Sequence, residues 1–264
     1  MNIDLSGKHA VVCGSTQGIG KATALALSKL GASITLVARN ESKLKQTLTE
    51  LNKNSKNDYI VADFTVPEDL SRKIKKWAST NQAHILINNT GGPKGGAITE
   101  AKTEEFYNAF TQHLICNHIL VQALIPGMKS LGYGRIINII STSVKQPLDG
   151  LGVSNTIRGA VANWSKTLAN ELGQFNITVN NVLHGETNTD RLQSIAENKA
   201  SNSLNINIDD VLAGMAAQSP MKRIAEPEEV ANAVTFLASP AASYINGINV
   251  PVDGGRTKSL QSLE

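Results

Sequence analysis

Three glycines in the segment GSTQGIG have the spacing of a phosphate-binding turn. They are Gly14, Gly18 and Gly20, and they follow the apolar segment HAVVCG and open a segment of helical pattern. The first glycine permits a tight turn, the second lets the backbone approach a pyrophosphate, and the third allows close helix packing. Unpaired N–H groups at the helix N-terminus attract the phosphate oxygens. Three glycines alone also suit a simple packing turn, but the strand–turn–helix context favours a dinucleotide site.

The residues after the next predicted strand, SITLVA (33–38), indicate which dinucleotide binds. An NAD site places a carboxylate there to accept hydrogen bonds from the ribose hydroxyls. This chain instead continues from Ala38 to Arg39 and Asn40. A guanidinium can hold a 2′-phosphate through two parallel hydrogen bonds, so the sequence predicts NADP in preference to NAD. The alternative is that Arg39 is an exposed cation at the start of a helix.

Strand-like and helix-like segments alternate along the chain with little between them. Short apolar segments predict strands at 9–14, 33–38, 59–63, 83–89, 134–141, 177–183 and 248–255. Helical spacing predicts helices between the strands, including 154–173 and a long one from about Thr103 to Ser130, which Pro126 should interrupt. Seven strands alternating with helices predict an α/β fold: a Rossmann-type, doubly wound parallel sheet in a single domain over residues 1–264.

One connection is longer than such a fold needs. Residues 187–220 are polar, rich in Asn and Ser, and weakly amphipathic in two pieces. Long connections are often functional, so we expect a substrate lid here. The alternative is a mobile excursion without a role.

The composition argues against several classes of protein. The formal net charge is only +3 and the lysines are scattered, so no nucleic-acid-binding patch is expected. Cys13 and Cys116 lie in unrelated contexts, which argues against a disulfide framework or a metal site and for a reducing compartment. We find no basic-then-apolar leader, and no apolar run approaches the ~20 residues that cross a bilayer. A cytoplasmic protein that binds neither nucleic acid nor membrane is predicted.

These motifs, in this order, resemble the short-chain dehydrogenase/reductase family in its 3-oxoacyl-carrier-protein-reductase-like branch. GSTQGIG matches T-G-x-x-x-G-x-G with Cys13 in place of the threonine, NNTGG (88–92) matches N-N-A-G, and residues 223–255 match the C-terminal signature. The resemblance covers nearly the whole chain. It implies that Asp63 touches adenine and that Thr187 and Thr189 lie near the nicotinamide amide. The full set implied to bind the cofactor is Gly14, Ser15, Thr16, Gln17, Gly18, Ile19, Gly20, Arg39, Asp63, Phe64, Asn89, Thr90, Gly91, Thr187 and Thr189.

The family's chemistry rests on a serine, a tyrosine, a lysine and an asparagine, and this chain keeps only the serine, at Ser141. The tyrosine and lysine positions hold Ser154 and Arg158, and the asparagine position holds His113. His184 replaces a proline of the family after the sixth predicted strand. No tyrosine of the chain has a lysine four or seven residues further on, so the resemblance transfers the fold and the cofactor but only part of the catalytic residues.

The replacements change how a proton can move. A phenol whose pKa is near 10 and is lowered by a lysine can transfer a proton near neutrality, whereas an aliphatic hydroxyl is a far weaker acid. Ser154 can still donate a hydrogen bond to a carbonyl oxygen, and Arg158 can polarise that oxygen or hold a ribose hydroxyl. His113 or His184 can take over proton transfer, or each can be an ordinary hydrogen-bonded side chain. Lys94 can meet an anionic substrate group or lie in a flexible surface turn.

Two functions remain. The first is an NADP-dependent oxidoreductase that transfers hydride between nicotinamide and a small carbonyl or alcohol substrate, with Ser141, Ser154, Arg158 and His113 as its catalytic residues. The second is a non-catalytic dinucleotide-binding protein that serves as a sensor or partner subunit. The retained Ser141 and Thr189 favour the enzyme. The resemblance also implies a homotetramer, with pairing through the long helix that contains Cys116 and the helix that contains Trp164.

Overall fold

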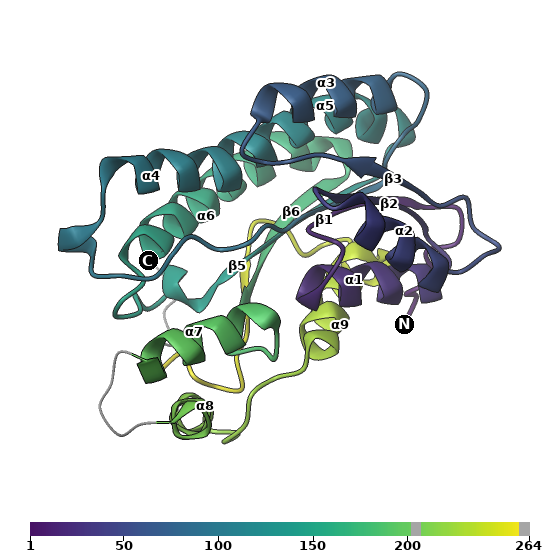
Figure 1. Ribbon diagram of the computed structural model, residues 1–264. Coiled ribbons are helices and arrows are strands. Elements are labelled where there is room, and N and C mark those ends of the chain that lie inside the picture. The colour runs from purple at the N-terminus through teal and green to yellow at the C-terminus, as the bar shows by residue number, and fades with distance from the viewer. Residues whose placement is uncertain (202–206, 259–264) are drawn as a thin grey trace.

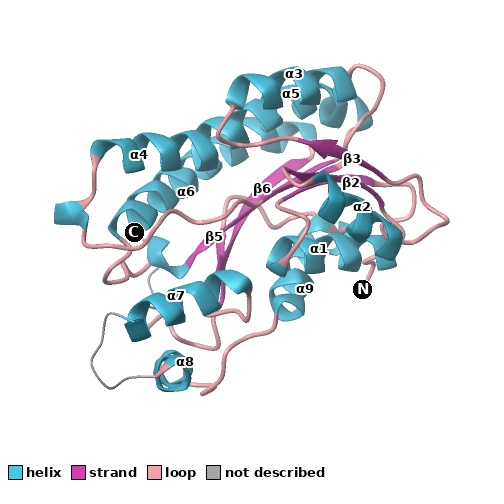
Figure 2. Cartoon of the chain, in the orientation of Figure 1, coloured by secondary structure: helices cyan, strands magenta, loops and turns pink. Residues whose placement is uncertain are grey.

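The computed structural model describes residues 1–201 and 207–258, so residues 202–206 of the predicted lid lie outside the described part. Its strands form one parallel sheet in the order β3-β2-β1-β4-β5-β6-β7, with helices on both faces (Figure 1, Figure 2). The strands are β1 His9–Cys13, β2 Ser33–Ala38, β3 Asp58–Val61, β4 Ile85–Asn88, β5 Gly134–Ser141, β6 Ile177–His184 and β7 Asn249–Val252. The predicted doubly wound sheet is confirmed. The predicted bounds differ most at the last strand, which was expected over 248–255 and is shorter in the structure.

The helices make two apolar cores, one on each face of the sheet. The helices are α1 Gly18–Lys29, α2 Glu41–Glu50, α3 Pro67–Ala78, α4 Thr103–Phe110, α5 Cys116–Leu131, α6 Gly152–Leu172, α7 Asp190–Ser201, α8 Ile208–Ala217 and α9 Pro227–Ala238. Helices α1, α2 and α9 pack on one face, and α3, α5 and α6 pack on the other. Along β1, Val11 enters the core with α3 and α5, while Val12 enters the core with α1 and α9. Burial on both faces explains why these strands read as continuous apolar segments.

The long helical segment that begins at Thr103 differs from its prediction in two ways. It is interrupted by a π-helical turn at Thr111–Ile115, not by Pro126, which lies inside α5. The prediction of a break at Pro126 is therefore wrong, because the helix continues despite the missing proline N–H. By length and composition, Thr103–Leu131 is also apolar enough to cross a membrane, contrary to the expectation that no segment approaches this. Its inner face nevertheless packs into the core through Cys116, Leu120 and Leu124.

A ladder of buried asparagines fixes the register of the strands that carry the site. Asn88 donates to Asn138 at 2.8 Å, Asn138 donates to Asn181 at 2.9 Å, and Asn181 donates to Asn249 at 2.8 Å. These residues are register partners across β4, β5, β6 and β7. Asn138 also donates to Ser165 of α6 at 3.2 Å, so the ladder ties that helix to the sheet. A slip of register would break these amide–amide hydrogen bonds and leave more buried polar groups unpaired, which costs free energy.

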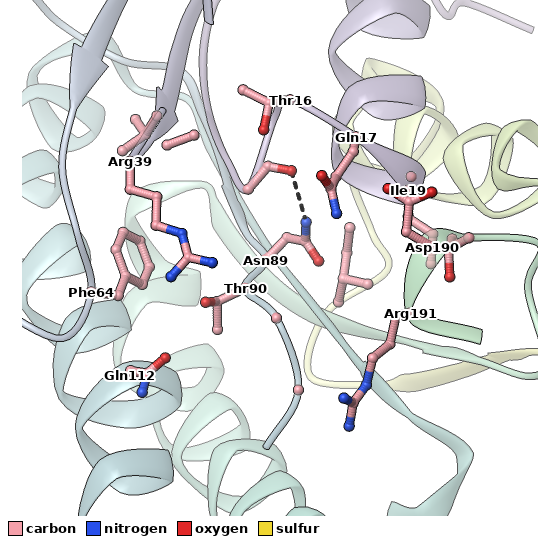
Figure 3. A pocket seen from close by; sticks show the side chains of 18 of the residues that line it. Thr16, Gln17, Ile19, Arg39, Phe64, Asn89, Thr90, Gln112, Asp190 and Arg191 are labelled. Carbon is pink, nitrogen blue, oxygen red and sulfur yellow. Dashed lines mark hydrogen bonds between the residues drawn. The ribbon is translucent and has the colours of Figure 1, made fainter. Parts of the chain in front are cut away.

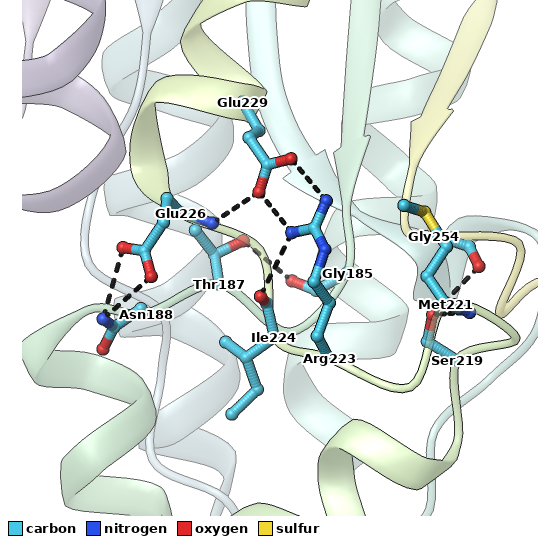
Figure 4. Close-up of polar contacts among 10 residues, drawn as sticks. All are labelled: Gly185, Thr187, Asn188, Ser219, Met221, Arg223, Ile224, Glu226, Glu229 and Gly254. Atoms are coloured by element: carbon cyan, nitrogen blue, oxygen red, sulfur yellow. Dashed lines mark hydrogen bonds and ion pairs between the residues drawn. The ribbon is translucent and has the colours of Figure 1, made fainter.

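The segment between β6 and α9, which carries α7 and α8, is fixed near both ends (Figure 4). At its start, the amide of Asn188 donates to the carboxylate oxygens of Glu226 at 3.2 and 3.3 Å. Near its end, the hydroxyl of Ser219 donates to the carbonyl oxygen of Gly254 at 2.9 Å. The two helices agree with the two amphipathic pieces predicted for residues 187–220.

Candidate active site

A cavity of about 670 Å³ lies at the carboxyl ends of the strands and extends toward α7. It opens where the strand order reverses between β1 and β4, which is where ligands bind in open parallel sheets. Its wall includes residues at, or just after, the ends of six strands, represented by Gly14, Arg39, Asp63, Asn89, Ser141 and His184. Figure 3 shows the side chains of Arg39 and Asn89 among the residues that line the cavity.

The glycine-rich turn has no room for side chains. A Cβ at Gly20 would lie 2.1 Å from the carbonyl oxygen of Gly14, and one at Gly14 would lie 2.9 Å from the carbonyl oxygen of Asn89. Gly14 and Gly18 also have φ of 59° and 51°, in the left-handed region that favours glycine. The amide of Asn89 reaches the Cys13 and Gly14 carbonyls at 3.4 Å and fastens the turn to the end of β4. The turn therefore presents bare backbone to the cavity at the start of α1.

One end of the cavity is positively charged. Arg39 and Lys43 line it, and Figure 3 shows the Arg39 guanidinium directed inward beside Phe64. Asn40 accepts a hydrogen bond from the Lys43 N–H at 3.0 Å and so caps α2, which fixes this corner. Asp63 also lines this end, and hydrogen bonds from Thr65, with a smaller contribution from Arg39, hold the pKa of its carboxyl below the usual value. This end suits an anionic group attached near a ribose.

The structure brings most of the predicted cofactor residues to the cavity wall. Those that line it are Gly14, Thr16, Gln17, Gly18, Ile19, Arg39, Asp63, Phe64, Asn89, Thr90, Gly91 and Thr189. Three others lie behind the wall. Ser15 donates to the Val37 carbonyl at 3.4 Å, Thr187 donates to the Gly185 carbonyl at 3.1 Å, and Gly20 packs on the preceding turn. These three residues support the wall and do not form it.

The other end of the cavity gathers the residues at the family's catalytic positions. Ser141 ends β5, and its register partner His184 ends β6, so the two are neighbours across the sheet. Ser154 and Arg158 lie in the first part of α6, which begins at Gly152, two residues before its predicted start. Four residues separate them, so they share one face of the helix. All four side chains belong to residues that line the cavity.

Arg158 is a buried cation without a carboxylate partner among the described residues. Only 7% of it is exposed, and its Nη1 donates to the Ile139 carbonyl oxygen at 2.8 Å. Its Nε is buried without a hydrogen-bond partner in the described part of the chain. Burial, together with the positive charge of Arg191, lowers the pKa of Arg158 to about 10. The guanidinium therefore remains charged at neutral pH in a site that does not neutralise it.

His184 is neutral at physiological pH. Burial is the main cause and the charge of Arg158 contributes, so that the pKa of His184 falls to about 4, although a hydrogen bond with Gly185 opposes the shift. Nδ1 lies 2.8 Å from the Gly185 carbonyl oxygen. A carbonyl oxygen only accepts, so Nδ1 carries the proton and Nε2 has a free lone pair. The lowered pKa makes the imidazole of His184 a weak base, whose Nε2 can accept a hydrogen bond at this end of the cavity.

His113 does not reach the cavity, although its position was predicted to be catalytic. It lies inside the π-helical turn, where it is buried and Gln112 lines the cavity instead. Burial, and then the charge of Arg158, hold its pKa well below the usual value, while a hydrogen bond with the Gly91 backbone opposes this. We therefore assign His113 to the support of the wall rather than to contact with a substrate.

Two cationic residues of the cavity wall were not predicted from the sequence. Lys43 joins Arg39 at the first end, and Arg191 enters from the start of α7 at the other. Lys43 could have been found, because it lies one helical turn after Arg39. Nothing in the sequence indicated that Arg191 lines the cavity, because it lies on the long connection whose position in space the sequence does not determine.

Comparisons with known proteins find relatives that match this chain over nearly its whole length. A family model described as "Enoyl-(Acyl carrier protein) reductase" matches residues 14–257. The 3-oxoacyl-[acyl-carrier-protein] reductase FabG of Vibrio cholerae is 32% identical over 258 residues, covering 96% of this chain and 98% of that protein. The NADPH-dependent reductase BacG of Bacillus subtilis is 31% identical over 262 residues, covering 97% and 100%. The crystal structure of L-sorbose reductase from Gluconobacter frateurii, complexed with NADPH and L-sorbose, superposes with a TM-score of 0.92 at 33% identity, covering 98% of this chain and 100% of that chain.

Proposed function

This chain belongs to the short-chain dehydrogenase/reductase family, and from that premise we propose that it is an NADP(H)-dependent oxidoreductase acting on a small carbonyl or alcohol. The observation that carries the proposal is one cavity with a cationic end at Arg39 and a reacting end at Ser141, Ser154, Arg158 and His184. Relatives named as NADPH-dependent, or solved with NADPH, support this choice of cofactor. The absence of a carboxylate at Ala38 supports it independently.

The residues present fit a dinucleotide along the whole cavity. The bare backbone of the turn at Gly14 and Gly18, with the N-terminus of α1, would hold the pyrophosphate. Arg39 and Lys43 would hold the 2′-phosphate, and Thr189 would lie toward the nicotinamide. When bound, the cofactor supplies or accepts a hydride at its nicotinamide ring. The remaining steps belong to the protein's own side chains.

Ser141 and Ser154 orient the substrate by donating hydrogen bonds to its oxygen. The charge of Arg158 stabilises the negative charge that develops on this oxygen as the carbon gains or loses hydride. In alcohol oxidation, Nε2 of neutral His184 accepts the proton through one of the two hydroxyls. In carbonyl reduction, His184 delivers a proton only when acid solution protonates it. We therefore expect slow reduction near neutrality, compared with family members that retain the phenol.

We also propose that α7 and α8 act as the substrate lid, because α7 contributes Arg191 and Ile195 to the cavity wall. The hydroxyl of Thr189 accepts the Leu192 N–H at 3.3 Å and caps the start of α7, which positions Arg191. Both bases of the segment are anchored, at Asn188 and at Ser219 (Figure 4).

A homotetramer in the cytoplasm is the proposed assembly and location. Large apolar side chains are exposed on α4 and the π turn, namely Tyr107, Phe110 and Ile115, and a second copy would cover them. Symmetric closure is the general expectation for oligomers of soluble enzymes. Cys13 and Cys116 are free and buried, as suits a reducing compartment.

The test separates turnover from binding. The protein is titrated with NADPH and NADH, and NADPH consumption is then followed with a panel of ketones and aldehydes, while NADP⁺ reduction is followed with alcohols. We expect tight NADPH binding and slow turnover that Ser141→Ala removes. Among the described residues that line the cavity none is a tyrosine, which favours the alternative of a non-catalytic dinucleotide-binding protein. Tight binding without turnover of any substrate would establish that alternative, and no NADPH binding would refute both.

A further inference from the structure

Two guanidinium groups meet at the reacting end of the cavity. A Cβ built on Gly92 would lie 3.8 Å from both Nε and Nη2 of Arg191 and 4.0 Å from Nη2 of Arg158. The two arginines come from different elements, Arg158 from α6 and Arg191 from the start of α7. Gly92 offers no side chain, so the space between the two groups stays open toward the cavity that both residues line.

Neither guanidinium has an acidic partner among residues 1–201 and 207–258. Each donates one hydrogen bond to a backbone carbonyl: Arg158 to Ile139, and Arg191 to Pro93 through its Nη2. The acidic residues of the cavity wall are Asp63, at the opposite end, and Asp190. Figure 3 shows that the Arg191 side chain extends away from Asp190, and no ion pair joins Arg191 to it.

The uncharged groups beside Arg158 sharpen the imbalance. Burial, and then the charge of Arg158, lower the pKa of both His113 and His184. Both imidazoles are therefore neutral, and neither balances the charge of Arg158. Arg158 is buried and Arg191 is exposed at the cavity, so their like charges repel each other across space that water screens only in part, and an anion between them relieves this. Nε of Arg158 is buried without a hydrogen-bond partner in the described part of the chain, and the Arg191 side chain makes its one hydrogen bond there through Nη2.

The position of the pair relative to the serines limits the anion. Ser154 and Arg158 are four residues apart on α6, which corresponds to a rise of about 6 Å along a helix. A substrate oxygen held by Ser141 and Ser154 can therefore be only a short distance from the group held by the arginines. A planar carboxylate matches the fork of a guanidinium, and two forks can hold it from two sides.

We propose that this enzyme is selective for short oxo acids and the corresponding hydroxy acids, with Arg158 and Arg191 binding the carboxylate one or two carbons from the reacting carbon. The inference rests on the proposed function. The carbonyl carbon gains a hydride from NADPH, which becomes NADP⁺, and the carbonyl oxygen gains a proton supplied by solvent through a serine hydroxyl, while the carboxylate is only bound. Arg191 is a specificity residue carried by the lid, which couples substrate capture to the position of α7.

Calorimetric binding tests the proposal without turnover. The protein is saturated with NADP⁺, which cannot reduce a carbonyl, and is titrated with 2-oxobutanoate, 3-oxobutanoate and the methyl ester of each. At least one free acid should bind about tenfold or more tightly than its ester, the scale of a charge-assisted hydrogen bond. Arg191→Gln should remove most of this difference and leave NADP⁺ affinity unchanged. Lys199→Gln is the matched control, since Lys199 also lies on α7, is exposed and does not line the cavity.

Three results would overturn the proposal. The first is equal affinity for acids and esters in the unmodified protein. The second is a loss of NADP⁺ affinity in Arg191→Gln as large as the loss of acid affinity, which would assign the arginine to the cofactor. The third is an effect of Lys199→Gln equal to that of Arg191→Gln, which would show that the preference for acids arises from the overall surface charge and not from a site at Arg191. Failure of the proposed function would show separately, as no NADP⁺ binding or as no turnover of any carbonyl or alcohol, whereas failure of this proposal would leave both intact and remove only the preference for acids.

Discussion

Replacing Arg39 with alanine should remove the preference for NADPH and leave NADH binding nearly unchanged. Arg39 is exposed at the end of β2, and no ion pair or hydrogen bond of its side chain appears in the described part of the chain. Its removal therefore takes nothing from the core or from α2, which Asn40 caps independently. A change in cofactor affinity would then report on a contact with the cofactor.

The magnitude follows from the contact that is lost. A hydrogen bond to a charged group contributes about 1.5–3 kcal/mol, and 1.4 kcal/mol is about tenfold in affinity. Lys43 lines the same end of the cavity and would retain part of the attraction for a 2′-phosphate. We therefore expect Arg39→Ala to weaken NADPH binding by ~1–3 kcal/mol, or about 5- to 150-fold.

Fluorescence titration of the protein with NADPH and with NADH measures this change. Arg72→Ala is the matched control, because Arg72 is exposed on α3, pairs with Asp69 and lies outside the cavity wall. A surface pair of this kind contributes at most about 1 kcal/mol to stability, so the control protein should fold. Equal affinity of the unmodified protein for the two cofactors would refute the reasoning, as would an equal loss of both in Arg39→Ala.

Four further outcomes are expected. The pKa of His184 falls from its ordinary 6.5 to about 4, so the unfolded chain binds a proton that the folded one does not, and stability should fall as pH drops below 6.5. His184 should account for up to about 2 kcal/mol of the stability lost at pH 5 in urea unfolding, so His184→Gln should reduce the loss by about that amount, and an unchanged pH slope in the variant would contradict the burial argument. The Cβ of Gly20→Ala would lie 2.1 Å from a backbone oxygen, so this substitution should lower both the Tm and the affinity for NADPH. A Cβ at Gly159 has no such neighbour within 4 Å, so Gly159→Ala should lower neither. Combining Ser154→Tyr with Arg158→Lys should raise carbonyl reduction in steady-state assays, since general acid catalysis contributes about 10²–10⁴-fold, and no gain would place the limitation elsewhere. Sedimentation should show a tetramer, and a monomer at micromolar concentration would contradict the proposed assembly.

The sequence by itself determined the sheet and the cofactor end of the site, because both depend on local patterns. Strands buried on both faces must be continuously apolar, so β2 and β5 were predicted with their observed bounds. The turn from Gly14 to Gly20 depends on backbone freedom at fixed spacing, and Arg39 follows directly from its strand. The replacement of the tyrosine by Ser154 was likewise visible in the chain alone.

The tertiary structure decided the reacting end. Whether a histidine faces a substrate depends on helix rotation and register, and the π turn buries His113 while the pairing of β5 with β6 brings His184 beside Ser141. The charge of Arg158 lowers the pKa of His113 and of His184, because the fold buries the three side chains near one another. Arg191 is 33 residues beyond Arg158 on a connection without a strand, so only packing of α7 over the cavity brings the two guanidiniums to Gly92. Contacts between segments that are distant in sequence have no local pattern from which they can be read.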